Sequence, residues 1–180
     1  MTEAPSIFYL LYDGYAGFEL VFMTNNLMDK RTATVGFGKA PCRSVENQWT
    51  VVDRDILDLR PEEVDLLVIP GREPMRIIDD PAYKERVEAL LTLIRAVNER
   101  GGQLAAICGG PTFLAYAGVL DGRRCTHSLE RPGPEFSKAL FTNGYLTVDG
   151  NITTAQGQAF PEFAVQMGRL MGVYQTEEQA

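Results

Sequence analysis

One stretch decides the fold: Gly101-Gly102-Gln103-Leu104-Ala105-Ala106-Ile107-Cys108-Gly109-Gly110-Pro111-Thr112-Phe113-Leu114-Ala115. It predicts a buried strand that ends at Cys108, a sharp turn on glycines, and a helix that begins at about Gly110-Pro111. Small residues on both sides of the sulfur allow two backbones to approach closely. The pattern is typical of a nucleophile elbow, whose usual form is Gly-x-Ser-x-Gly. Cys108 is therefore the first candidate for a reactive side chain.

The pattern around Cys108 has two interpretations. Free backbone N–H groups at the start of the following helix, among them that of Gly109, would stabilise a thiolate and donate to an oxyanion. Alternatively, Cys108 is a structural cysteine, because cysteine is among the most often buried residue types. The spacing alone leaves both interpretations open.

Length and composition indicate a single domain over residues 1–180. The chain is 45% hydrophobic and 23% charged, as ordinary globular proteins are. The net charge of -7 disfavours nucleic acid and anionic membrane surfaces as partners, because both select basic patches. The sequence has neither a signal peptide nor an apolar run near 18 residues, so we expect a cytoplasmic protein.

The three cysteines are Cys42, Cys108 and Cys125. Their odd number and wide spacing argue against a disulfide framework and against a Cys-x-x-Cys metal site. We therefore expect reduced thiols, no metal and no cofactor. Cys125 is expected to pack as a small hydrophobic residue, and Cys42 to lie in a strand or loop.

Strands alternate with helices along the chain, which predicts a three-layer α/β/α sandwich with a mostly parallel sheet. The first helix has an apolar stripe of Phe18, Val21, Phe22 and Met28 available to face the sheet. The expected strands and helices are a strand at 6–12, a helix at 16–27, a strand at 32–38, two short strands between 42 and 58, a strand at 65–71, a helix at 81–99, the elbow strand and helix to 116, a short strand at 124–127, a hairpin at 145–154 and a helix at 160–171.

Three of the predicted strands end on short glycine-containing turns: Asp13-Gly14, Pro70-Gly71 and Cys108-Gly109. In sheets of this kind, ligands bind outside the carboxyl ends of the strands. We expect these three turns to line one cleft. Backbone N–H groups of Gly71 or Arg72 could serve an oxyanion there, and the Arg72 side chain could steer an anion; a solvated loop is the alternative.

Glu19 and His127 are the candidate partners of Cys108. Glu19 follows the first strand on a helix whose start faces the expected cleft, where it could hydrogen-bond the sulfur and, if protonated, donate to it and so lower the thiol pKa. The alternative is a carboxylate that offsets the helix dipole. His127 is the single imidazole of the chain. Its short strand is expected beside the elbow strand, although a lone histidine at a strand end more often caps a loop or meets solvent.

Several segments together resemble the ThiJ/PfpI superfamily, whose members are class I glutamine amidotransferase-like cysteine proteins. They extend from about residue 6 to 173 and are Tyr12-Asp13-Gly14 with Phe18-Glu19, Leu67-Val68-Ile69-Pro70-Gly71, Ala106-Ile107-Cys108-Gly109-Gly110-Pro111, Leu114-Ala115-x-Ala117-Gly118-x-Leu120-Asp121-Gly122-Arg123, Asp149-Gly150-Asn151-Ile152-Thr153-Thr154-Ala155 and Pro161-Glu162-Phe163-Ala164.

The resemblance implies a flavodoxin-like sandwich, a reactive Cys108, an acidic partner at Glu19 and a homodimer. Two departures from the family pattern change what is expected. Members that resemble intracellular proteases have a histidine directly after the cysteine, whereas Gly109 stands here, so we do not expect protease activity from that dyad. His127 comes one residue early relative to the family histidine, and a one-residue slip in a strand reverses a side chain.

The function expected from these features is that of a cysteine-dependent hydrolase or lyase, hydratase or glyoxalase-like, acting on a small carbonyl or isocyanide substrate. The Cys108 thiolate would attack an electrophilic carbon while Glu19 exchanges the proton, with His127 as a second acid or base if it reaches. Backbone N–H groups of Gly71 or Arg72 and of Gly109 would hold the developing anion. Two alternatives are a redox or electrophile sensor that uses the same oxidisable thiol, and a chaperone-like dimer.

Overall fold

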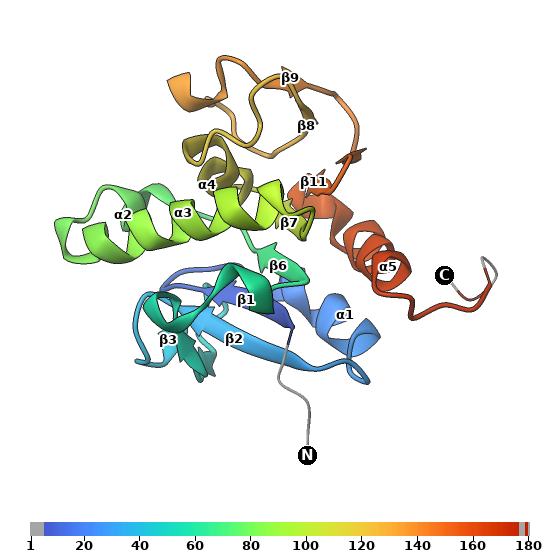
Figure 1. Cartoon of the computed structure of the whole chain (residues 1–180), viewed down its shortest axis with the longest axis horizontal. Coiled ribbons are helices and arrows are strands. Elements are labelled where there is room, and N and C mark those ends of the chain that lie inside the picture. The colour runs from blue at the N-terminus through green and yellow to red at the C-terminus, as the bar shows by residue number, and fades with distance from the viewer. Residues whose placement is uncertain (1–5, 177–178, 180) are drawn as a thin grey trace.

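A seven-stranded sheet with the strand order β10-β11-β7-β6-β1-β2-β5 forms the middle layer (Figure 1). The computed structural model describes residues 6–176 and residue 179. Every neighbouring pair in the sheet is parallel except β10 and β11. The strands are β1 (Ile7–Leu11), β2 (Thr32–Gly36), β3 (Cys42–Arg43), β4 (Trp49–Thr50), β5 (Arg54–Asp55), β6 (Leu66–Ile69), β7 (Gln103–Ile107), β8 (Arg124–Cys125), β9 (Leu140–Phe141), β10 (Leu146–Asp149) and β11 (Ile152–Ala155). The mostly parallel α/β fold predicted from the sequence is confirmed.

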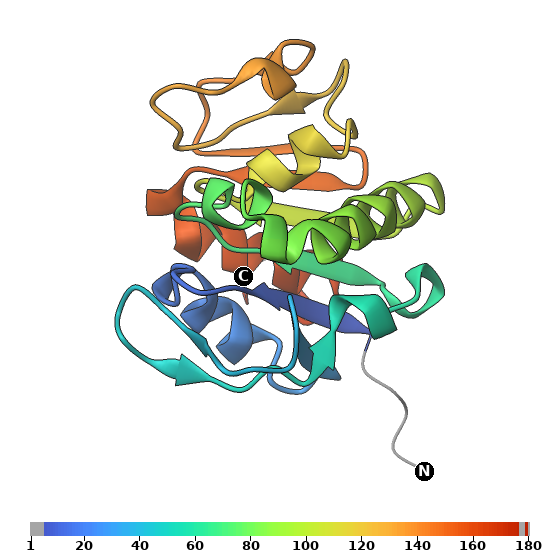
Figure 2. The same ribbon diagram turned by 90° about the vertical axis from the view of Figure 1, so that its left-hand side faces the viewer.

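Helices cover both faces of this sheet. On one face, α1 packs against α5; on the other, α3 contacts α4 and β7 (Figures 1 and 2). Four strands of the middle of the sheet are buried at nearly every position, because helices exclude water from both faces. The helices are α1 (Phe18–Asn26), α2 (Met75–Ile78), α3 (Lys84–Glu99), α4 (Pro111–Tyr116) and α5 (Phe160–Leu170). None of the helices in the described residues is long and apolar enough to cross a bilayer.

The prediction that an apolar stripe of the first helix faces the sheet is wrong, because its members are exposed: Phe18, Val21, Phe22 and Met28. The buried side of α1 carries Glu19, Leu20 and Met23 instead. The rings of Phe18 and Phe22 lie against Phe160 at the start of α5, with ring centroids 5.4 and 5.5 Å away. The aromatic rings therefore pack on one another at the edge of the α1–α5 pair, while Glu19, Leu20 and Met23 face inwards.

The strand beside the elbow strand is also different from the expected one. β11 pairs with β7, whereas β8 pairs with β9 in a separate two-stranded sheet. β11 is fully buried and joins β10 through a turn at Gly150, whose φ of 59° suits glycine. β8 contacts β10 and β11, and just after it the Thr126 N–H donates to the Thr154 hydroxyl of β11 at 2.8 Å.

Candidate functional site

The elbow at Cys108 has the strained backbone that this motif requires. Cys108 has a φ of 61°, a conformation that L-residues rarely adopt. Arg72, on the loop that follows β6, also has a positive φ, of 92°. Residues held in this region cost on the order of 1–3 kcal/mol each and cluster at functional sites. Two such residues therefore meet at the carboxyl ends of adjacent strands.

Close approach between the β6 loop and the elbow is possible only because both carry glycines. A Cβ on Gly71 would overlap the Cys108 Cβ and would lie 2.9 Å from the sulfur. A Cβ on Gly109 would overlap the Arg72 carbonyl oxygen. Larger side chains at either position would separate the two loops, so the glycines set how closely the backbone of one loop approaches the sulfur on the other.

Glu19 is the acidic group of this site and is 1% exposed. Its Oε2 accepts a 2.6 Å hydrogen bond from the Gly71 N–H. Its Oε1 has no nitrogen or oxygen partner among the described residues and faces the Cys108 sulfur, with which Glu19 interacts. Burial raises the pKa of Glu19 to about 7, and the charge of Glu46 adds to that rise. Near neutral pH, Glu19 is therefore able both to hold and to release a proton.

Opposing effects act on the Cys108 thiol. Burial raises its pKa, and so does the negative charge of Glu19 when that group is ionised. Hydrogen bonds from the backbone N–H groups of Arg72 and Gly109 lower it, and the first two effects prevail. Ionised Glu19 thus raises the thiol pKa, whereas the lowering expected from the sequence requires Glu19 to be protonated and to donate to the sulfur. The pair is better described as two acids that share one proton, with the two N–H groups ready to receive the thiolate.

His127 lies beside the elbow, but its ring contacts its own loop and two phenylalanine rings. The Ser128 N–H donates to the Cys108 carbonyl oxygen at 3.0 Å, which fixes the segment next to the elbow. His127 is 7% exposed, and its Nδ1 accepts a 3.2 Å hydrogen bond from the Leu129 N–H. Its ring packs between Phe136 and Phe141, with centroids 4.9 and 4.8 Å away.

The surroundings of His127 keep the imidazole neutral, because burial lowers its pKa. Since Nδ1 is an acceptor, the proton of the neutral ring lies on Nε2. This arrangement favours a ring that holds its own loop in place.

Two residues near the sulfur were not singled out as site residues by the sequence analysis. The Tyr12 hydroxyl lies 2.7 Å from the Gly71 carbonyl oxygen and 3.0 Å from that of Pro70, so it holds the β6 loop in place. A Cβ on Gly157 would lie 3.3 Å from the Cys108 sulfur and 3.4 Å from Glu19 Oε1. Both residues follow strands that end at the elbow edge, and that position is the signal that could have identified them.

Glu46 caps the helix that carries Glu19. The N-cap of α1 is Gly17, which has no side chain to offer. Glu46, on the turn between β3 and β4, accepts hydrogen bonds from the Gly17 N–H at 3.0 Å and the Phe18 N–H at 3.4 Å. The carboxylate also offsets the positive end of the helix dipole. A residue distant in sequence therefore fixes the start of α1, one residue before Glu19.

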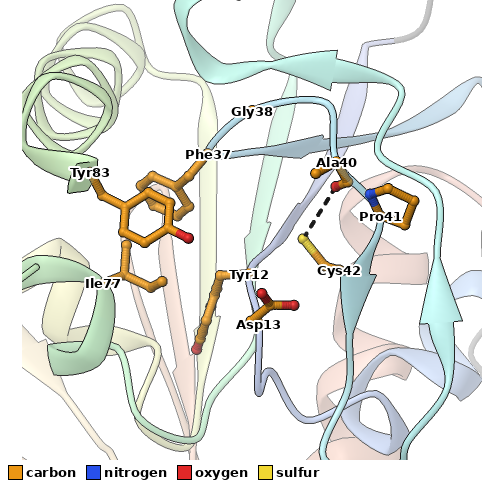
Figure 3. A pocket seen from close by; sticks show the side chains of 9 residues that line it. All are labelled: Tyr12, Asp13, Phe37, Gly38, Ala40, Pro41, Cys42, Ile77 and Tyr83. Carbon is orange, nitrogen blue, oxygen red and sulfur yellow. Dashed lines mark hydrogen bonds between the residues drawn. The ribbon is translucent and has the colours of Figure 1, made fainter.

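Cys42 belongs to a different cavity, of about 50 Å³. Figure 3 shows its sulfur directed towards the Ala40 carbonyl oxygen, with Asp13 nearby and Tyr83 across the cavity. Burial and the charge of Asp13 raise the pKa of this thiol to about 11. Cys125 is fully buried. No group of three His, Cys, Asp or Glu side chains in the described part of the chain is arranged to hold a metal ion.

Known proteins with this architecture were found by sequence and by structure. Residues 5–169 match the model of the DJ-1/PfpI family. A protein of Thermococcus kodakarensis named a deglycase is 26% identical over 142 residues, which cover 77% of this chain and 82% of that protein. An uncharacterised protein of Methanocaldococcus jannaschii is 27% identical over 154 residues, which cover 82% of this chain and 68% of that protein.

The solved structures agree with this assignment. A DJ-1 superfamily protein of Agrobacterium tumefaciens superposes with a TM-score of 0.78 at 20% identity, over 97% of this chain and 94% of the other. At that identity the likeness concerns the fold, and the family model covers most of the chain. The chain belongs to the DJ-1/PfpI family.

Proposed function

We propose that this protein is a cysteine-dependent enzyme that converts small carbonyl compounds, with Cys108 as the nucleophile and Glu19 as the proton carrier. The observation that supports it is the Glu19–Cys108 pair, in which a buried carboxyl with a pKa of about 7 faces a thiol that receives two backbone N–H groups. General acid–base catalysis is most efficient when the pKa of the group lies near the working pH. Several sequence relatives are named deglycases, which agrees with carbonyl chemistry.

In the first step, the Glu19 carboxylate takes the proton of the Cys108 thiol, and the resulting thiolate adds to the aldehyde carbon of the substrate. A carbon–sulfur bond forms, the π electrons of the carbonyl move to oxygen, and that oxygen takes the proton from Glu19. The Arg72 and Gly109 N–H groups, which hold the thiolate beforehand, lie beside the developing oxyanion. The Gly71 N–H already donates to Glu19 and is therefore not available to the oxyanion. Gly71 contributes instead by allowing the β6 loop to approach the elbow closely.

In the second step, an α-oxoaldehyde adduct rearranges. The Glu19 carboxylate removes the proton from the carbon bonded to sulfur and returns it to the neighbouring carbon. The hydroxyl proton on the first carbon moves to the oxygen of the second, so that the first carbon becomes the carbonyl of a thioester and the second carries a hydroxyl group. Water then hydrolyses the thioester to a 2-hydroxy acid and releases Cys108. The sum is addition of one water to the α-oxoaldehyde, with no external oxidant or reductant.

The second candidate function is that of a redox sensor. The Glu19 Oε1 atom, which has no nitrogen or oxygen partner among the described residues, favours it. Two molecules of peroxide would oxidise the Cys108 thiolate to a sulfinate and leave two of water. Protonated Glu19 could then donate to a sulfinate oxygen, because its Oε1 has no nitrogen or oxygen partner among the described residues. In either function we propose a homodimer; the exposed apolar side chains Phe18, Val21 and Phe22 of α1 are consistent with a covered surface.

Turnover of methylglyoxal and of an isocyanide separates the candidates. We expect methylglyoxal turnover by the native protein, its loss in Cys108→Ser, and a large decrease in Glu19→Gln. Absence of turnover with both compounds, together with rapid oxidation of Cys108 by peroxide, would favour the sensor. Turnover that persists in Cys108→Ser would contradict the proposed mechanism, because no other thiol lies at the elbow.

A further inference from the structure

A cavity of about 240 Å³ lies next to the elbow, on the side of α4. Its walls come from three segments: the start of α2, the first two turns of α4, and the loop that follows β8. The side chains used below are Met75, Thr112, Tyr116, Leu129 and Pro134.

Each of these segments also reaches the Cys108 site. The Thr112 N–H donates to the carbonyl oxygen of Gly109 at 3.1 Å. Leu129 follows Ser128, whose N–H donates to the Cys108 carbonyl oxygen. Met75 follows Pro74, whose Cδ would lie 3.3 Å from a Cβ on Gly109. The cavity therefore lies next to the backbone of the elbow along all three segments.

The lining is mostly apolar. Met75, Leu129 and Pro134 offer hydrocarbon and thioether surface. Thr112 is 1% exposed, and its hydroxyl oxygen has no hydrogen-bond partner among the described residues. Because this hydroxyl oxygen is covered by other atoms, it offers no polar contact to a ligand in the cavity.

The charges at the cavity cancel. One arginine, Arg131, and one glutamate, Glu135, line it. Tyr116 stays an uncharged phenol, because burial and the charges of Glu135 and Asp79 raise its pKa. A lining with no net charge suits an uncharged group.

His127 holds the loop wall of the cavity in place. Its Nδ1 accepts from the Leu129 N–H, and its ring packs on Phe136 at the other end of that loop. The single histidine thus fixes the segment between Leu129 and Phe136, which gives it a positioning role that needs no contact with the substrate.

We propose that this cavity receives the substituent of the substrate that extends away from the reacting carbonyl, and that the substituent is an uncharged aryl or branched alkyl group. The inference rests on the proposed attack by Cys108. A cavity of roughly 150 Å³ lined by apolar side chains accommodates benzene, so about 240 Å³ is sufficient for a phenyl ring. Substrates with only a methyl group would leave the cavity unfilled.

Alkylation of Cys108 by two chloroketones tests the cavity without turnover. In each reaction the thiolate displaces chloride and a carbon–sulfur bond forms; chloroacetone carries a methyl group, and 2-chloroacetophenone a phenyl ring. Rates are measured by mass spectrometry of the intact protein and of the Cys108 peptide, and are divided by the rates with glutathione. We expect the corrected rate ratio of the phenyl to the methyl reagent to be about tenfold or more in the native protein.

Filling the cavity should remove that preference. In Met75→Trp and in Leu129→Trp the corrected ratio should fall towards one, while Met28→Trp, an equal change on an exposed part of the chain, should keep the native ratio. Circular dichroism identifies any variant that does not fold. A native ratio near one, or a ratio that folded Met75→Trp and Leu129→Trp both retain, would overturn the proposal. Because alkylation needs no turnover, a selective thiol without methylglyoxal activity would reject the proposed enzyme and keep the cavity assignment.

Discussion

Cys108 and Cys42 are both half-buried thiols with a carboxylate close by, yet their surroundings differ in what they offer to a thiolate. The sulfur of Cys108 receives two backbone N–H groups, and its carboxyl partner, Glu19, has a pKa of about 7 and shares a proton with it. The sulfur of Cys42 faces the carbonyl oxygen of Ala40, an acceptor that favours the protonated thiol. Asp13, its carboxylate, only adds charge that opposes ionisation. A neighbouring carboxyl therefore does not make a cysteine reactive; donors aimed at the sulfur and a transferable proton are needed as well.

The largest expected effect is on methylglyoxal turnover, when each of the two thiols is replaced in turn. Cys108→Ser should reduce methylglyoxal turnover by at least about 1000-fold, because the nucleophile is lost. Cys42→Ser should keep native turnover. At pH 8, with a pKa of about 11, only about one Cys42 in a thousand is ionised. Peptide mapping after brief iodoacetamide treatment should find Cys108 modified first, and equal labelling of both thiols would break the comparison.

Replacing Glu19 separates its two roles. Glu19→Gln removes the proton carrier, so turnover should fall about 100-fold or more. It also removes the negative charge that raises the pKa of Cys108, so alkylation by iodoacetamide near pH 8 should become faster. The matched change near Cys42 is Asp13→Asn, which should speed alkylation of Cys42 without affecting turnover. A parallel loss of turnover and of alkylation in Glu19→Gln would show that the variant has only disturbed the site.

Stability provides a second measurement for Glu19. The pKa of this carboxyl is raised in the folded state, so the folded protein holds the proton more tightly than the unfolded chain. Its contribution is complete below the unfolded pKa, near 4.5, and is lost as pH rises to about 7. Urea unfolding of native protein and Glu19→Gln should therefore differ in pH dependence between these values, and Glu19→Gln should be the more stable protein above pH 7.

Adding one methyl group at Gly71 should disturb the Cys108 environment through packing alone. A Cβ at this position would overlap Cys108, so Gly71→Ala should lower the free energy of unfolding by about 1–3 kcal/mol. It should also slow Cys108 alkylation, because the loop that supplies the Arg72 N–H must move. Gly144→Ala is the matched control, since the atom nearest to its added Cβ would be the Leu146 carbonyl oxygen at 3.4 Å and the residue is exposed. Equal stability of both variants would refute the role assigned to the glycine.

The sequence predicts the elbow well because its information is local. Small residues around Cys108, Pro111 in the first turn of the helix and the Asp149-Gly150 turn each determine structure within a few residues. The order of the strands depends on contacts between distant segments. The residues of β8 and β11 do not by themselves determine which of the two strands pairs with β7. The predicted gathering of Glu19, the β6 loop and Cys108 follows from the rule that parallel strands end at one edge.

The finer features of the site depend on directions that residue types do not encode. The Gly71 N–H points at Glu19 while that of Arg72 reaches the sulfur, and Arg72 has a positive φ that non-glycine residues rarely adopt. The apolar residues of α1 could have faced either way, and their rings pack on Phe160 only because α5 returns beside α1. Glu46 caps α1 across a long sequence interval, which no helix-capping pattern predicts.

The smallest effect concerns Glu46, which links the hairpin that begins at Cys42 to the helix that carries Glu19. Its negative charge helps to raise the pKa of Glu19, so Glu46→Gln should move the Glu19 titration below about 7. The glutamine oxygen can still accept from the Gly17 N–H, which preserves the helix cap, whereas Glu46→Ala should lose both the charge effect and about 1 kcal/mol of stability. The measurement is the pH dependence of methylglyoxal turnover, with Glu99→Gln, an exposed carboxylate at the end of α3, as the control for net charge. If Glu46→Gln and Glu99→Gln shift the profile equally, the effect belongs to the overall charge of the protein; a shift confined to Glu46→Gln would show that the two cysteine regions are coupled through one carboxylate.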